Sequence, residues 1–420
     1  MLSPVRARLS TVLCTAVRGP RPNRALSRSA REGRARAAHA VAGGKGHASD
    51  EKRKILEDAI GRMNKSYGQN AVMFLTGARS QVETVPSGVL TLDMALGGGL
   101  PKGRVIEVFG PESSGKTTLA LQAIAEVQKR GGLAALVDVE HAVDPVYAAK
   151  LGVNLDDLVL SQPEHGEGAL NIVDELARTG VVDLIAVDSV SALIPKAELE
   201  GEVGATQVGG QARLMSSSLR RLSKNANMFG CTIIFINQLR QKIGVMYGNP
   251  ETTSGGQALK YYSSVRIDVR RREILKEGDK NTGIRVRTRV VKNKCAPPLR
   301  DAEFDIRFDS GIDTVGCVID AAETSGLVKR RGAYYYFEDA MLGQGRAKTV
   351  DFLKSNPEVL GRMEALVLEK LHAGFTPPID TAEDDALAVA EEAGAVDGEA
   401  EAEPEVDITL TLGEEDKPEE

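Results

Sequence analysis

The stretch GPESSGKT, residues 110–117, has the residue types and the spacing of a loop that holds phosphate. It fits the pattern G-x-x-x-x-G-K-[ST], in which glycines let backbone N–H groups turn towards a phosphate group. It follows an apolar strand-like run, RVIEVF (104–109), and opens a helix-like run, TTLALQAIAEVQKR (117–130), whose first turn adds partial positive charge. The predicted phosphate-binding residues are Gly110, Pro111, Glu112, Ser113, Ser114, Gly115, Lys116, Thr117 and Thr118.

Within this loop, Lys116 is placed to reach the β- and γ-phosphates of a nucleotide, and the hydroxyl of Thr117 to bind Mg²⁺. A second Mg²⁺ group is predicted at Asp188, which ends the apolar run LIAVD (184–188). Ligands of open α/β sheets gather at the carboxyl ends of strands. Many strands end in aspartate, and the phosphate loop is what gives this one a metal-binding interpretation. These residues predict ATP and Mg²⁺ as ligands.

Another acid, Glu140, ends the run LAALVDVE (133–140). A carboxylate there could orient and deprotonate the water that attacks the terminal phosphate. The residues alone leave open the alternative of a solvated acid at a strand end. Tyr147 is placed to lie against adenine, although a single tyrosine is more often a core or surface residue.

A polar loop, predicted to span residues 239–254, follows the apolar run CTIIFI (231–236). Structureless loops of this length are uncommon in compact domains and are usually functional or disordered. Gln238, just before it, is placed to sense the γ-phosphate, so we expect the loop to respond to the nucleotide. A second Gly-rich loop, 198–209, follows the run that ends at Asp188.

Cationic and aromatic side chains near these two loops indicate a nucleic-acid strand as their ligand. The alternative is a pair of ordinary solvated loops. The candidates for contact with DNA are Arg213, Arg220, Arg240, Lys242, Tyr247, Gly255 and Gly256.

The pattern along the chain predicts an α/β fold with a central, mostly parallel sheet. LAALVDVE, VVDLIAVD (181–188) and CTIIFI are nearly continuous apolar runs, typical of strands that are covered on both faces. VRIDVRR (265–271) and IRVRTRVV (284–291) alternate instead, which predicts antiparallel strands at one edge. The 43 glycines and only 4% aromatic residues favour an α/β enzyme over an aromatic-rich sandwich.

Two further structured segments flank this core. Apolar residues at 55, 56, 59, 60 and 63 form one helical stripe, which predicts a helix over 50–66 with Gly68 beyond its end. A small α/β piece from about residue 314 ends in a helix that has Asn356 as N-cap, Pro357 at its first position and Gly374 past its end.

The net charge of −6 combines unlike segments. Residues 1–49 hold nine Arg, one Lys and a single acid, which is typical of an organelle transit peptide, with a basic nucleic-acid-binding arm as the alternative. Residues 380–420 hold seventeen acids and one base, so we expect the tail from 375 to be disordered. The four cysteines show no paired spacing for a metal or disulfide framework, and Cys231 is expected to pack as an apolar thiol. No apolar run approaches the ~20 residues of a membrane span, so no membrane partner is predicted.

From about residue 50 to about residue 372, the chain resembles the bacterial RecA recombinases. The resemblance rests on collinear blocks, which are PSGVLTLDMALGGGLPKGRVIEVFGPESSGKTTLALQAIAEVQKRGG, DVEHAVDP, LIAVDSVSALIPKAELEGE, NQLRQKIGVMYGNPETTSGGQALK and VVKNK. The stretches GCTIIFINQLRQKIGV and NKCAPPLRDAEFDI look most like the cyanobacterial branch. One departure is ATQV (205–208), where relatives often have a Met-containing segment, and it puts a base-wedging contact of the first loop in doubt.

The resemblance implies further roles, residue by residue. Asp144 and Tyr147 match positions beside the adenine, and Gln238 matches the residue that couples the γ-phosphate to the second DNA loop. Lys292 and Lys294 match lysines that reach a neighbouring subunit's ATP across a filament interface. The helix near 50–66 matches the segment that docks on that neighbour.

The implied fold is a P-loop NTPase (RecA-like) core, and the implied protein is a recombinase with DNA-stimulated ATP hydrolysis. It would form helical homo-filaments on single-stranded DNA, pair them with double-stranded DNA and exchange strands. Its expected segments are a transit peptide (1–49), a polymerisation segment (50–82), the ATPase core (83–313), a C-terminal domain (314–374) and an acidic tail (375–420). The plastid stroma is favoured over the mitochondrion, and no mediator protein is specified.

Three alternatives predict different features. A P-loop small-molecule kinase would need an acceptor pocket and a lid, and its ATPase would not respond to DNA. A RecA-like helicase motor would normally carry a further helicase-specific domain. A DNA-coating protein without catalysis would have no need of the set formed by Lys116, Thr117, Glu140 and Asp188.

Overall fold

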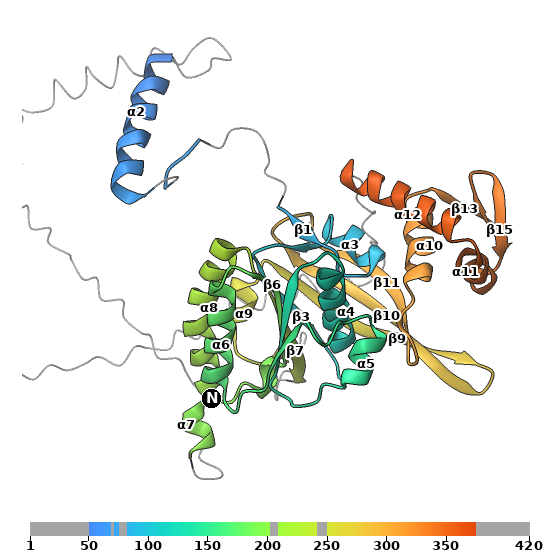
Figure 1. The fold of residues 1–420 in the computed structure, drawn as a ribbon, viewed down its shortest axis with the longest axis horizontal. Coiled ribbons are helices and arrows are strands. Elements are labelled where there is room, and N and C mark those ends of the chain that lie inside the picture. Colours follow the sequence, from blue (N-terminus) through green and yellow to red (C-terminus); the bar gives the residue numbers. More distant parts are fainter. Residues whose placement is uncertain (1–49, 69–70, 75–81, 202–208, 242–249, 375–420) are drawn as a thin grey trace, which may run out of the picture. The chain divides into compact units, whose positions relative to one another are not determined.

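The computed structural model describes residues 50–68, 71–74, 82–201, 209–241 and 250–374 (Figure 1). The chain divides into two units, residues up to Ser80 and residues from Gln81 onward. The predicted transit peptide (1–49) and acidic tail (375–420) lie outside the described residues.

The first unit contains the predicted N-terminal helix, α2 (Asp50–Tyr67). Gly68 follows it with φ 106° and donates its N–H to Asn64 O (3.1 Å), which confirms the predicted end. The side chain of Asn64 exchanges two hydrogen bonds with the backbone of Val72, both 2.9 Å, so the chain doubles back along the helix. On the predicted apolar stripe, Ile55 and Leu56 are exposed.

The second unit is built on a central sheet in the order β12-β11-β10-β9-β3-β7-β6-β4-β5. Six adjacent strands run parallel to one another, namely β9, β3, β7, β6, β4 and β5. Antiparallel pairs extend the sheet beyond β9, through β10, β11 and β12. The prediction of a mostly parallel sheet with antiparallel strands at one edge is therefore confirmed. The strands are β3 (Val105–Gly110), β4 (Leu133–Asp138), β5 (Leu158–Ser161), β6 (Val182–Asp188), β7 (Thr232–Gln241), β9 (Val265–Glu277), β10 (Lys280–Asn293), β11 (Arg300–Arg307) and β12 (Gly311–Ile312). Strand β8 (Glu251–Thr253) pairs with β7, and β1 (Thr84–Val85) pairs with β2 (Leu100–Pro101).

Helices cover both faces of this sheet, as the continuous apolar runs require (Figure 1). Side chains alternate along a strand, so Ile234 and Ile236 of β7 join one core, whereas Ile233 and Phe235 join the other. The helices of the first core are α3 (Leu90–Leu96), α4 (Lys116–Lys129) and α5 (Pro145–Lys150), and those of the second are α6 (Gly166–Arg178), α8 (Gly210–Phe229) and α9 (Ala258–Tyr262). Cys231 is fully buried, and burial raises the pKa of its thiol to about 12, as expected for an apolar packing role. A 3-10 helix, η1 (Val190–Ala192), and a short α-helix, α7 (Lys196–Leu199), follow β6.

The predicted C-terminal α/β piece packs around a third core, to which Met94 of α3 also contributes. Its elements are α10 (Thr314–Thr324), β13 (Val328–Arg331), β14 (Tyr334–Phe337), β15 (Ala340–Gln344), α11 (Arg346–Ser355) and α12 (Pro357–His372). Arg346 ties it to the central sheet, because its guanidinium contacts Asp305 of β11 (2.5 Å) as well as Asp320 of α10 (2.8 Å). The predicted cap of α12 was wrong in one respect: Asn356 stands at the N-cap position, but its amide donates to Phe352 O of the preceding helix.

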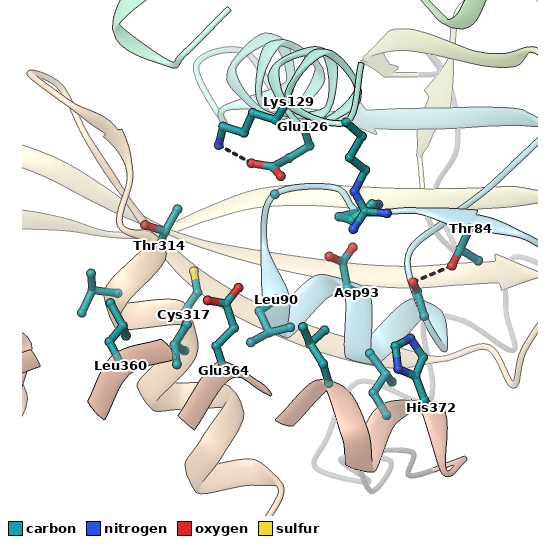
Figure 2. A pocket seen from close by; sticks show the side chains of 18 residues that line it. Thr84, Leu90, Asp93, Glu126, Lys129, Thr314, Cys317, Leu360, Glu364 and His372 are labelled. Carbon is teal, nitrogen blue, oxygen red and sulfur yellow. Dashed lines mark hydrogen bonds and ion pairs between the residues drawn. The ribbon is translucent and has the colours of Figure 1, made fainter. Parts of the chain in front are cut away.

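A cleft of about 420 Å³ is lined by residues of α3 and α4 and of the C-terminal elements (Figure 2). Asp93 and Glu126 line it on one side, and Cys317, Glu364 and His372 line it on the other. The phosphate-loop residues are not part of its lining, so it is not the nucleotide site. Within the described parts of the chain, no helix is both long and apolar enough to cross a bilayer.

Candidate nucleotide and DNA site

The phosphate loop connects β3 to α4, as its sequence context predicts. Two of its glycines are required by close approach, since a Cβ on Gly110 would lie 2.1 Å from Val269 O and one on Gly115 would lie 2.5 Å from Ile306 Cδ1. Gly115 also adopts φ 95° as the N-cap of α4, and no side chain caps this helix. The first-turn N–H groups are therefore available to an anion.

Lys116 is nearly buried, and its ammonium lies across the loop. Its Nζ donates to Gly110 O (3.1 Å) and to Pro111 O (2.6 Å). Burial lowers the pKa of Lys116, and this effect is opposed by the carboxylates of Asp188 and Glu140. A weakly solvated cation next to the uncapped N-terminus of α4 suits the terminal phosphates of a nucleotide.

Thr117 and Asp188 meet where the sequence predicts an Mg²⁺ site. Thr117 Oγ1 donates to Asp188 Oδ2 at 2.7 Å, although the two residues are 71 positions apart. Burial raises the pKa of Asp188 to about 6, the hydrogen bond from Thr117 opposes this rise, and the nearby Glu140 adds to it. One hydroxyl and one carboxylate fit Mg²⁺, which usually takes its remaining ligands from water and substrate phosphate.

Glu140 lies two residues beyond the end of β4 and is exposed. Its Oε1 accepts hydrogen bonds from Ser189 Oγ and from Gln238 Nε2 (3.1 Å). Glu140 is therefore exposed but held by two side chains, one directly after β6 and one within β7. Asp138 closes the turn that carries Glu140, because its carboxylate accepts from the backbone N–H groups of Ala142 and Val143.

The predicted adenine-side residues belong to α5. Asp144 is its N-cap and accepts from Val146 N at 2.8 Å. Tyr147 packs against the first core, and its hydroxyl lies 3.1 Å from Thr118 Oγ1 on α4. The contact joins α5 to the helix that opens at the phosphate loop.

The second predicted loop is shorter than its sequence suggested. Strand β7 continues through Asn237 and Gln238 to Gln241 and pairs with β8, so residues 239–241 and 251–253 form a hairpin stem. Arg240 is exposed on this stem. Lys242 and Tyr247 lie outside the described residues.

The residues that follow the second loop pack against η1 and the start of α8. A Cβ on Gly255 would lie 3.0 Å from Val190 Cγ1, and one on Gly256 would lie 2.8 Å from Ala212 Cβ. Both glycines therefore allow the backbone to pack closely against η1 and α8, where a side chain would not fit without a shift of its neighbours. The first loop is described only at its ends, where α7 precedes residues 202–208 and Gly209 precedes α8.

Two predicted DNA-binding arginines lie on the helix that follows the first loop. Arg213 and Arg220 are seven residues apart on α8 and are both exposed, so they share one helical stripe. A cationic stripe therefore runs along α8 from the turn against which Gly256 packs.

Lys292 and Lys294 lie at the end of β10, beside the C-terminus of α9. Lys292 Nζ donates to Lys260 O and to Tyr261 O (3.3 Å), and Lys294 Nζ donates to Tyr261 O (3.4 Å). Burial, with Lys294 and Arg266 nearby, lowers the pKa of Lys292 to about 8. Two cations thus share the carbonyl end of one short helix.

Sequence reasoning missed Ser189, which donates to Glu140 and lies 2.5 Å from Ser191 Oγ. The available signal was its position, directly after Asp188 in LIAVDS. Sequence reasoning placed Ser114 in the phosphate loop but gave its side chain no role of its own. The hydroxyl of Ser114 is buried inside the loop and has no hydrogen-bond partner among the described residues. That hydroxyl, the uncapped helix and Lys116 together fit a bound phosphate group.

Comparison with known proteins bears on this arrangement. Residues 54–313 match the model of the RecA N-terminal domain, and residues 316–372 match that of the RecA C-terminal domain. The chain belongs to the RecA family. It is 58% identical to Protein RecA of Synechococcus sp. (strain CC9311) over 325 residues, which is 77% of this chain and 85% of that protein. Protein RecA of Synechococcus elongatus is 55% identical over 343 residues, covering 80% of this chain and 96% of its own length.

Membership of the RecA family makes this protein a DNA-dependent ATPase and a recombinase. It confirms the predicted family, the P-loop NTPase fold and the enzyme class. RecA proteins generally bind ATP with Mg²⁺ and form filaments on DNA. The rival interpretations as a kinase, a helicase motor or a non-catalytic coat are set aside.

Proposed function

We propose that this chain binds ATP and Mg²⁺ through residues 110–118, Asp188 and the α5 pair Asp144 and Tyr147, and uses the nucleotide to control its grip on DNA. The observation that carries the proposal is the hydrogen bond from Gln238 Nε2 to Glu140 Oε1, at 3.1 Å. It joins the candidate catalytic carboxylate to the strand that leads into the second DNA loop. One side-chain contact therefore links nucleotide chemistry to DNA contact.

Different residues of the site have different roles in ATP hydrolysis. Lys116 and the first-turn N–H groups of α4 hold the phosphates, and Lys116 stabilises charge on the terminal phosphate during transfer. Mg²⁺, when bound, neutralises phosphate charge, and Thr117 and Asp188 are the groups that would hold it. Glu140 accepts a proton from the attacking water, while the hydroxyl of Ser189 fixes its orientation.

Gln238 is the coupling group. Its amide now donates to Glu140, and a terminal phosphate offers competing acceptor oxygens. An exchange of partner would shift the end of β7, from which the hairpin stem and the second loop extend. Arg213, Arg220 and Arg240 would then contact the DNA backbone, which makes the affinity salt-dependent.

The filament extends the same site to a second subunit. We propose that Lys292 and Lys294 leave the carbonyls of α9 to reach the nucleotide of an adjacent subunit. The exposed apolar pair Ile55 and Leu56 on α2 would dock on a neighbour, because an apolar stripe without cover favours burial. Each ATP would thus be held by two copies of the chain.

The test is ATP hydrolysis with and without single-stranded DNA. We expect the DNA to stimulate turnover of the natural chain and Lys116→Ala to abolish it. The matched control is Lys129→Ala at the far end of α4, where the exposed lysine forms an ion pair with Glu126, and it should behave like the natural chain. Full DNA-stimulated turnover by Lys116→Ala would contradict the proposal.

We further propose that the protein acts in the recombinational repair of organelle DNA, in the plastid stroma, with the mitochondrion as the alternative. The acid-poor composition of residues 1–49 and the similarity to cyanobacterial relatives support this location. A fusion of residues 1–49 to a fluorescent protein should enter plastids. A signal confined to mitochondria or to the cytosol would contradict it.

A further inference from the structure

A buried ion pair lies in the middle of the central sheet, outside the nucleotide-binding residues. Glu107 of β3 and Arg266 of β9 are directly opposite one another in the parallel ladder, and Arg266 Nε lies 2.6 Å from Glu107 Oε2. The side chain of Glu107 is fully buried and that of Arg266 is 9% exposed. The guanidinium also lies 4.5 Å from the ring centre of Phe109.

Stability alone does not account for such a pair. Removing two charges from water is costly, and well-packed apolar residues of similar volume often stabilise a fold equally well or better. The pair does, however, hold a carboxylate in one fixed orientation, because the short Arg266 contact occupies Oε2. The other oxygen, Oε1, is thereby left to accept from a neighbour on β7.

That neighbour is Asn237, which is fully buried and uses both ends of its amide. Its Nδ2 donates to Glu107 Oε1 and to Ser254 O, each at 3.0 Å. Its Oδ1 accepts from the backbone N–H of Gln238 at 2.9 Å. One side chain thus joins the strand before the second DNA loop to the residue after it, directly beside Gln238.

Strand β9 holds the same hairpin at a second point. Arg270 forms a two-pronged ion pair with Glu251 of β8, one arm of which is 3.2 Å. Arg266 and Arg270 are four residues apart on β9. Arg266 is linked to the base of the hairpin stem through Glu107 and Asn237. Arg270 contacts the outer end of the stem directly, at Glu251.

We propose that Asn237, oriented by the Glu107–Arg266 pair, is a positioning residue. It couples the position of Gln238 to both strands of the hairpin stem that carries the second DNA loop. The inference rests on the proposed function, in which that loop binds DNA in response to the nucleotide. Without Asn237, Gln238 would still contact the nucleotide, but the second strand of the stem, next to Ser254, would no longer move with Gln238. Nucleotide binding and DNA binding would then persist as separate events.

The measurement is a ratio, namely the Kd for a labelled oligothymidylate in ADP divided by the Kd in a non-hydrolysable ATP analogue. Asn237→Leu keeps the side-chain volume and removes every hydrogen bond of the amide. Asn237→Thr suits a strand and keeps a hydroxyl for Glu107, but it cannot also bond Ser254 O. We expect the ratio to fall at least tenfold in both variants, with the affinity for the ATP analogue within twofold of the natural chain.

The control is Ile234→Val, which removes one buried methylene group from the same strand without touching the amide network. Its ratio should match that of the natural chain. An unchanged ratio in Asn237→Thr, or an equal fall in Ile234→Val, would overturn the inference. A ratio of one in the natural chain would instead contradict the proposed function, and with it this inference.

Discussion

Asp93 offers a prediction whose size follows from the structure. It is buried in α3 beside the interdomain cleft, and it accepts a hydrogen bond from Ser87 N at 2.9 Å (Figure 2). Burial raises the pKa of Asp93 to about 7 from an ordinary 3.8, and the nearby Glu126 contributes to the rise. The folded protein therefore keeps a proton on Asp93 at pH values where the unfolded chain has lost it.

The sign and magnitude of the effect follow from linkage. Below pH 3.8 both states are protonated, so the group contributes no pH dependence. Between pH 3.8 and about 7 only the unfolded state ionises, and the free energy of unfolding falls by about 1.4 kcal/mol per pH unit. From pH 5 to pH 8 this group alone should cost about 3 kcal/mol.

Asp93→Asn removes this titration and keeps an oxygen to accept from Ser87. We expect the variant to gain about 3 kcal/mol relative to the natural chain on moving from pH 5 to pH 8. Urea unfolding of both proteins at the two pH values measures the gain, and other titrating groups cancel in the comparison. A stability difference between the two proteins that is the same at pH 5 and at pH 8 would refute the reasoning, because it would mean that folding does not raise the pKa of Asp93, for example because Arg130 stabilises the ionised form.

Other predictions concern catalysis, the domain junction and the tail. Glu140→Gln keeps an acceptor for Ser189 and Gln238, so nucleotide affinity should be retained while turnover falls about 100-fold or more, and normal turnover would remove Glu140 as the base. Arg346→Met leaves the buried Asp305 without its main partner and should cost about 3 kcal/mol in urea unfolding, whereas the exposed control Arg362→Met should cost about 1 kcal/mol at most. Deleting residues 380–420 removes a strongly acidic segment and should strengthen binding to double-stranded DNA at low salt; an identical salt titration would show that the tail does not restrain binding.

The sequence predicts those parts of the site whose signal is local. The phosphate loop lies between a strand and a helix, and Asp188 and Glu140 follow apolar runs. Their joint location at one sheet edge follows from the rule for parallel strands. The meeting of Thr117 with Asp188 at 2.7 Å agrees with that expectation.

Features that depend on non-local pairing could not be predicted. The polar end of β7 has the sequence pattern of a loop. It forms a strand because it pairs with β8, which is also polar and lies ten or more residues away. The Glu107–Arg266 contact requires the strand order β9-β3-β7, which no local pattern specifies. Asn356 satisfies the pattern of a helix cap, yet the preceding helix ends so close that its carbonyl takes the amide instead.

Binding of single-stranded DNA to the natural chain in three nucleotide states tests the central claim most directly. A labelled oligothymidylate would be titrated with ATP analogue, with ADP and without nucleotide, at one fixed salt concentration. Because Gln238 is expected to respond to the terminal phosphate, binding should be markedly tighter with the ATP analogue than in the other two states. Equal affinity in all three states would contradict the link between Glu140, Gln238 and the second DNA loop.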